Sequence, residues 1–201
     1  MVEYGFLVEG LVRHPVAIMA IFVFATSVAV GHVTDEIRSL SVSTASNCVV
    51  RYREYLSLNG LTELSPEAAD VLGNHEGRLF LNGLATLSPE AAAGLAKHNR
   101  WLFLNGLTEL SPGVAEEFAF HKGWLSLNGL TTMSSELARI LARHRGRLFL
   151  DGLTEVSPEV AEIFVMNRAA ELSLDGLDSP SPDVVAILRR NPKIILPREY
   201  R

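Results

Sequence analysis

A six-residue motif recurs six times in this chain of 201 residues. It reads leucine, any residue, leucine, asparagine or aspartate, glycine, leucine, and its copies begin at Leu56, Leu79, Leu102, Leu125, Leu148 and Leu172. The spacing is 23 residues between the first five copies and 24 between the last two. Because one copy is too short to bury its own leucines, this repetition predicts a solenoid in which each unit packs on its neighbours.

Each unit predicts a short strand, a turn and a helix. The alternation at residues 79–81 is typical of a half-buried strand, and the Asn-Gly pair that follows ends it. We expect the turn to require a positive φ at Gly83, because glycine adopts this conformation without a steric penalty. The Ser-Pro-Glu sequence at residues 88–90 fits the N-cap and first turn of a helix of about ten residues.

The motif resembles the leucine-rich repeat family, in a short bacterial variant, over residues 56–196. This resemblance implies parallel strands on one face, helices on the other, and a non-catalytic role in protein–protein recognition. The fold class that we predict is therefore an α/β solenoid of leucine-rich-repeat type. We expect an N-terminal cap at residues 34–55, six repeats at 56–193 and a C-terminal cap at 194–201.

The N-terminal part has a different composition. Residues 14–34 contain no Asp, Glu, Lys or Arg, and this length approaches the ~20 residues that span a bilayer. We expect residues 1–33 to contain a hydrophobic helix that anchors the chain in a membrane or directs its export, which predicts a membrane-anchored or exported protein. The alternatives are a signal cleaved near residues 27–31 and a buried helix that covers the next domain.

Charge and motif content argue against several function classes. The net charge of −5 disfavours nucleic acid as the main partner, because phosphate binding needs a basic face. The single cysteine, Cys48, allows no intrachain disulfide. Since no hydrolase elbow or phosphate-binding glycine loop is present, we expect no enzyme activity, no cofactor and no small-molecule substrate.

The predicted strand face concentrates aromatic and arginine side chains. Alternation sends the residues before and between the paired leucines outward, and both tryptophans and three of the nine phenylalanines occupy these positions. We predict that the patch binds a protein partner, because such residues dominate interface energies. The predicted partner-binding residues are Arg78, Phe80, Trp101, Phe103, Trp124, Arg147 and Phe149.

Other interpretations of this patch stay open. The arginines could stack on the tryptophans as a purely structural device, with each cation–π contact contributing roughly 0.5–1 kcal/mol. Another part of the chain or a second copy could also cover the patch. At the level of function, the alternatives are a structural or oligomerisation spacer and a glycan-binding envelope protein that uses exposed tryptophans.

Two polar columns recur with the repeat. Histidine or asparagine follows each helix, and we expect it to cap the helix end rather than to bind a metal; the column is His75, His98, His121, His144, Asn167 and Asn191. Asparagine or aspartate follows each strand, and we expect its side chain to bond its own turn rather than calcium; the column is Asn59, Asn82, Asn105, Asn128, Asp151 and Asp175.

Overall fold

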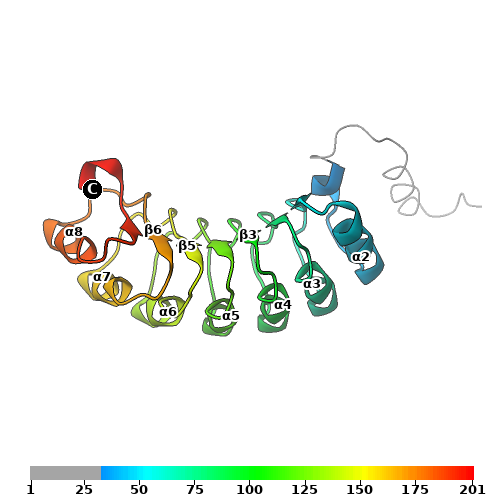
Figure 1. Ribbon diagram of the computed structural model, residues 1–201, viewed down its shortest axis with the longest axis horizontal. Coiled ribbons are helices and arrows are strands. Elements are labelled where there is room, and N and C mark those ends of the chain that lie inside the picture. The colour runs from blue at the N-terminus through cyan, green and yellow to red at the C-terminus, as the bar shows by residue number, and fades with distance from the viewer. Residues whose placement is uncertain (1–32) are drawn as a thin grey trace, which may run out of the picture.

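The computed structural model describes residues 33–201, and in this part short parallel strands alternate with helices along one continuous stack (Figure 1). The predicted α/β solenoid-like architecture is confirmed. The predicted hydrophobic helix within residues 1–33 lies outside the described residues, apart from Val33 itself. Across residues 33–201, no helix combines the length and the apolar character needed to cross a membrane.

All strands of the described part belong to one parallel sheet, and their order in the sheet is their order in the chain. The strands are β1 (Tyr55–Ser57), β2 (Arg78–Phe80), β3 (Trp101–Phe103), β4 (Trp124–Ser126), β5 (Arg147–Phe149), β6 (Glu171–Ser173) and β7 (Ile194–Ile195). The α-helices are α2 (Val42–Arg51), α3 (Pro66–Leu72), α4 (Pro89–Leu95), α5 (Pro112–Phe118), α6 (Ser135–Leu141), α7 (Pro158–Val165) and α8 (Pro182–Leu188). Two 3₁₀ helices, η1 (Val33–Glu36) and η2 (Arg198–Tyr200), flank them.

The register of the sheet aligns equivalent repeat positions. Leu79 lies opposite Leu102, and Trp101 lies opposite Trp124, so each position of the motif forms a column along the solenoid. The leucine columns are buried, with Leu79 and Leu81 fully inaccessible to solvent, as the alternation predicts. Stacked repeats thereby build the one core that no single repeat could build alone.

The helices begin as predicted but are shorter. In α4 the Ser88 hydroxyl accepts a hydrogen bond from the Ala91 N–H at 3.2 Å, and the corresponding serine caps every helix from α3 to α8. Helices α3 to α8 have seven or eight residues rather than about ten. The reason is that the chain already turns toward the next strand, and the His98 N–H bonds the Leu95 carbonyl at 3.0 Å.

The role predicted for the motif glycine is wrong. No described glycine has a positive φ. Glycine is required instead because neighbouring repeats approach closely, and a Cβ on Gly83 would overlap the main-chain carbonyl oxygen of Asn59 in the preceding repeat. The close approach of neighbouring repeats, rather than an unusual backbone conformation, therefore excludes larger residues at this position.

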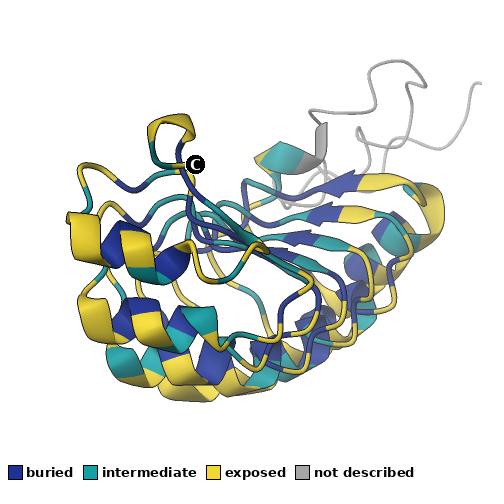
Figure 2. Cartoon of the chain, turned by 60° about the vertical axis from the view of Figure 1, so that its left-hand side comes forward, coloured by how far each residue is buried: buried dark blue, intermediate teal, exposed yellow. Residues whose placement is uncertain are grey.

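The solenoid forms a shallow arc (Figure 1). Helices lie along the outer, convex side, and the strands lie side by side along the inner side. Figure 2 shows the exposed residues gathered on the outer side of the helices and the buried residues between the helices and the strands. The inner side is therefore the face on which the predicted binding residues are placed.

Candidate binding surface on the strand face

The first outward column of the sheet forms a stack of planar side chains. The indole rings of Trp101 and Trp124 lie 3.9 Å apart at an interplanar angle of 15°. The guanidinium of Arg78 lies 4.4 Å from the centroid of the Trp101 ring, and that of Arg147 lies 4.1 Å from the centroid of the Trp124 ring. Strands β2 and β4 flank β3 on opposite sides, so both faces of the Trp101 indole are covered.

A second column of aromatic rings runs beside the first. Phe80 and Phe103 stack with their centroids 4.3 Å apart and their planes 3° apart, and Tyr55 packs on Phe80 at 4.7 Å. The two columns touch, because Trp101 packs on Phe103 at 6.0 Å and Trp124 packs on Phe149 at 5.8 Å. We call the seven predicted residues together with Tyr55 the aromatic face. The eight are Tyr55, Arg78, Phe80, Trp101, Phe103, Trp124, Arg147 and Phe149.

The structure brings all seven predicted residues together on this face. Tyr55 extends the face to β1, with 43% of its surface exposed, and its place in the repeat register is the sequence signal that could have included it. Arg78 is exposed, and the other six predicted residues are partly buried by their neighbours in the two columns. Both faces of each indole are stacked, on Arg78 and Trp124 for Trp101 and on Trp101 and Arg147 for Trp124, which leaves the indole edges to the solvent.

Three serines that also alternate outward are buried. Ser57, Ser126 and Ser173 keep only 2–5% of their surface exposed. Their hydroxyls donate to the side chains of Asp35, Asn105 and Asp151, which belong to the neighbouring repeat or to η1. Strand alternation alone does not predict this burial, because it results from a contact with a residue 21 or 22 positions earlier in the chain.

The asparagine and aspartate column forms a ladder between repeats. The side-chain oxygen of Asn59 accepts a hydrogen bond from the Asn82 main-chain N–H at 2.9 Å, and Asn82 accepts from the Asn105 N–H at 3.0 Å. The same bond recurs through Asn128 to Asp151. The predicted bond of each side chain to its own turn is therefore replaced by a bond to the next repeat, and the ladder fixes the register of the strand ends.

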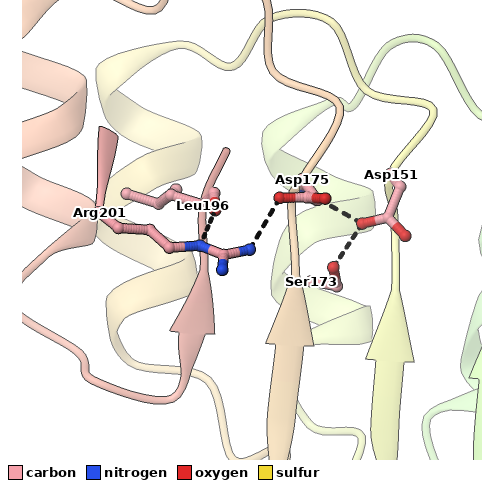
Figure 3. A network of polar contacts seen from close by, with 5 residues as sticks. All are labelled: Asp151, Ser173, Asp175, Leu196 and Arg201. Atoms are coloured by element: carbon pink, nitrogen blue, oxygen red, sulfur yellow. Dashed lines mark hydrogen bonds and ion pairs between the residues drawn. The ribbon is translucent and has the colours of Figure 1, made fainter. Parts of the chain in front are cut away.

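Charged residues stand at both ends of this ladder. In η1, Asp35 accepts from the Asn59 N–H at 2.9 Å. Near β7, the carboxylate of Asp175 accepts from Arg201 at 3.0 Å, and the Asp175 N–H donates to Asp151 at 3.0 Å (Figure 3). Arg201 also donates to the Leu196 carbonyl at 2.6 Å. Residues outside the repeats thus supply the partners that a further repeat would otherwise supply.

The histidine column lies inside the solenoid. His75 is 3% exposed, and His98, His121 and His144 are fully buried. Consecutive rings stack with centroids 5.8–6.4 Å apart and planes within 9–13° of parallel. The side chains reach the preceding repeats instead of their own helix ends, and His98 donates through Nε2 to the Gly77 carbonyl at 3.0 Å.

Several nitrogens of this column lack hydrogen bonds. Neither ring nitrogen of His121 makes a hydrogen bond of normal geometry, and the same holds for Nδ1 of His98 and Nε2 of His144. Burial lowers the pKa of His121 to about 3, with the positive charges of His144 and His98 adding to the effect. Burial, followed by the charge of His75, lowers the pKa of His98 to about 4, and burial also lowers the pKa of His144. These imidazoles are therefore neutral at physiological pH.

The part of the chain that the structure describes contains no group of three or more His, Cys, Asp or Glu side chains arranged to hold a metal ion. The histidine rings face one another through their planes, whereas metal coordination would require their in-plane nitrogens to converge. Comparison of the chain with protein-family models, with curated proteins and with solved structures finds no match.

Proposed function

We propose that this chain is a non-catalytic protein-recognition module, a solenoid of leucine-rich-repeat type that binds a protein partner through the aromatic face. The observation that supports the proposal most is the stack of Arg78, Trp101, Trp124 and Arg147 on the inner side of the arc. Tryptophan and arginine are the residue types that contribute most to protein interfaces. Their rigid stacking also lowers the conformational entropy that a partner's binding would cost.

The stacking geometry favours a protein over a glycan as the partner. Sugar rings bind tryptophan through its face, and both faces of Trp101 are occupied by Arg78 and Trp124. The edges that remain carry a positive partial charge and suit carbonyl oxygens, carboxylates and aromatic faces. A polypeptide offers all three groups. Membrane attachment or export through residues 14–34 remains part of the proposal and rests on the apolar composition of that segment alone.

Affinity capture from cell extract tests the proposal. The baits are the full chain, the Trp101→Ala/Trp124→Ala variant, and the control variant Phe120→Ala. Phe120 is an aromatic residue with 71% of its surface exposed; it lies in the turn that follows α5, away from the aromatic face. We expect a partner that the unmodified chain and the Phe120 variant retain and that the tryptophan variant loses, although all three have the same circular dichroism spectrum.

The opposite result would place the interaction elsewhere. If all three baits retain the same proteins, or if none retains any, the aromatic face has a structural role in holding strands together. Cross-strand aromatic pairs contribute about 0.2–1 kcal/mol each, so the tryptophan variant would then differ from the unmodified chain in stability alone.

A further inference from the structure

The aromatic face offers many hydrogen-bond donors to a partner and few acceptors. The indole N–H groups of Trp101 and Trp124 make no hydrogen bond with any residue in the range 33–201, and neither nitrogen is among the buried atoms without a partner. Both groups are therefore accessible to solvent as free donors. An indole nitrogen can donate but cannot accept, so each position admits only an acceptor from the partner.

The arginines add further donors to the same column. Arg78 is exposed and stacks on Trp101, and within the described residues it has no carboxylate partner. Arg147 lies 3.6 Å from Glu171, with 41% and 28% of the two side chains exposed. An exposed pair at that distance is weak, typically below about 1 kcal/mol, and a partner's carboxylate can replace Glu171.

Hydrogen bonds within the ladder occupy the side-chain oxygens that could otherwise accept a hydrogen bond from a partner. The side-chain oxygens of Asn82 and Asn105 accept hydrogen bonds from the N–H groups of the next repeats, which leaves their amide NH₂ groups as the donors available to a partner. Ser126 is buried and donates to Asn105. Asp151 accepts from Ser173, Asp175 and Asn128. From β2 to β4, the outward side chains therefore present donors and apolar edges.

The spacing of the two arginines sets a length for the partner. Arg78 starts β2 and Arg147 starts β5, three strand steps apart in the sheet. The stacking contacts of Arg78 on Trp101 (4.4 Å), Trp101 on Trp124 (3.9 Å) and Arg147 on Trp124 (4.1 Å) keep the two guanidinium groups within about 12 Å of each other. An extended peptide rises about 3.2–3.4 Å per residue, so side chains four residues apart, which point to the same side, come nearest to this separation.

From this geometry we infer that the aromatic face binds an extended acidic peptide segment, with two carboxylates four residues apart on Arg78 and Arg147 and main-chain carbonyls on the indole N–H groups. The inference rests on the proposed function and specifies its partner. A longer polyanion fits less well toward the β1 end, because residues 33–120 carry 11 Asp and Glu against 6 Lys and Arg. That excess of negative charge repels an anion that extends past Arg78 in this direction.

Selection from a display library of random twelve-residue peptides on the immobilised full chain tests the inference. We expect the selected peptides to be enriched in Asp or Glu pairs four residues apart. A labelled selected peptide should bind at least tenfold more weakly to the Arg78→Gln variant and to the Arg147→Gln variant, because each loses a charge-assisted hydrogen bond. Binding should also weaken as salt rises.

The matched control is Arg168→Gln. Arg168 follows α7, forms no ion pair within the described residues and lies outside the aromatic face, so its removal should leave peptide affinity unchanged. This variant changes the net charge by the same amount as the Arg78 variant. A uniform loss in all three variants would show nonspecific attraction and would overturn the inference.

The remaining outcomes separate the inference from the proposed function. Selected peptides that lack paired acids but lose binding to the Trp101→Ala/Trp124→Ala variant would overturn the acidic partner and leave recognition by this face intact. If every selected peptide binds the Trp101→Ala/Trp124→Ala variant as tightly as the unmodified chain, both the acidic-peptide inference and the proposed function are contradicted. A single-stranded oligonucleotide and phosphatidylserine vesicles serve as competitors of the labelled peptide. If either displaces it at a lower concentration than the unlabelled peptide does, the face binds a different anion and the peptide assignment is overturned.

Discussion

The first four repeats and the last two share one shape but differ in two polar columns. Histidine follows the helix in repeats one to four, and asparagine takes its place at Asn167 and Asn191. Asparagine follows the strand in repeats one to four, and aspartate takes its place at Asp151 and Asp175. Both changes occur between the fourth and fifth repeats, so the solenoid consists of two parts with different polar chemistry.

The asparagine side chains of the last two repeats each donate one hydrogen bond and accept another. Asn167 donates to the Phe164 carbonyl at 2.5 Å and accepts from the Ala169 N–H at 2.9 Å. Asn191 donates to the Val165 carbonyl and accepts from the Lys193 N–H, each at 3.0 Å. The histidine part instead buries several ring nitrogens without hydrogen bonds. A buried polar atom without a partner costs about 1–3 kcal/mol, so the first part carries a penalty that the second avoids.

Lowering the pH should produce the largest difference between the two parts. In the unfolded chain these histidines bind protons near pH 6.5, whereas in the folded chain the pKa of His98 is about 4 and that of His121 about 3. Their contribution to the free energy of unfolding is complete above pH 6.5 and falls as the pH decreases. At pH 4.5, His98 and His121 each lower the free energy of unfolding by about 2–3 kcal/mol, or by about 5 kcal/mol together.

Urea denaturation at pH 7.0 and 4.5 measures this effect. The control is the His98→Asn/His121→Asn variant, which gives two of the first repeats the residue that the last two already contain. Carboxylates titrate in both proteins and cancel in the difference. We expect the unmodified chain to lose about 5 kcal/mol more than the variant over this range. Equal losses would show that the buried histidines do not set the acid limit of the first part.

Substitution of Asp151 should have the next largest effect, because its carboxylate accepts hydrogen bonds from Asn128 in the first part and from Ser173 and Asp175 in the second. Asp151→Ala leaves the Asp175 N–H and the Ser173 hydroxyl without their acceptor, which should lower the free energy of unfolding by about 1–3 kcal/mol. Asp151→Asn restores the residue type of the first four repeats and keeps an acceptor oxygen. It should cost less than about 1 kcal/mol.

Urea denaturation of the two Asp151 variants distinguishes a ladder bond from a charge effect. A loss that is equally large in the asparagine variant would mean that the negative charge, rather than the acceptor oxygen, stabilises the junction. The asparagines of the first four repeats and the aspartates of the last two would then stabilise the ladder in different ways.

Features that depend on one repeat were predictable from the sequence. The buried leucines, the serine N-caps and the outward position of Trp101 and Trp124 follow from alternation and from residue preferences within about 20 neighbouring residues. The contact of Arg78 with Trp101 was also open to prediction, because a fixed period places equivalent positions side by side.

Hydrogen bonds and close backbone approaches between repeats were not predictable from the sequence. Asn82 bonds a residue 23 positions later, and the burial of Ser126 depends on a residue 21 positions earlier. Local preferences predicted that the asparagine side chain bonds its own turn and that Gly83 has a positive φ. Both predictions are wrong, because each position contacts the neighbouring repeat, and the sequence of a single repeat does not show that contact. Free donors on the aromatic face follow only from knowing which oxygens the ladder uses.

The smallest effect is expected at Arg201, where an ion pair takes the place of a ladder bond. Arg201→Gln removes the contact with Asp175, but both side chains are 51% exposed, so the free energy of unfolding should fall by less than about 1 kcal/mol. In 1 M salt the unmodified chain and the variant should become nearly equal in urea denaturation, because salt screens exposed charges. A loss as large as that of Asp151→Ala, unchanged by salt, would mean that the bond from Arg201 to the Leu196 carbonyl, which joins the end of η2 to the end of β7, makes the larger contribution. In that case the stability of the second part would depend on η2 as much as on its own repeats.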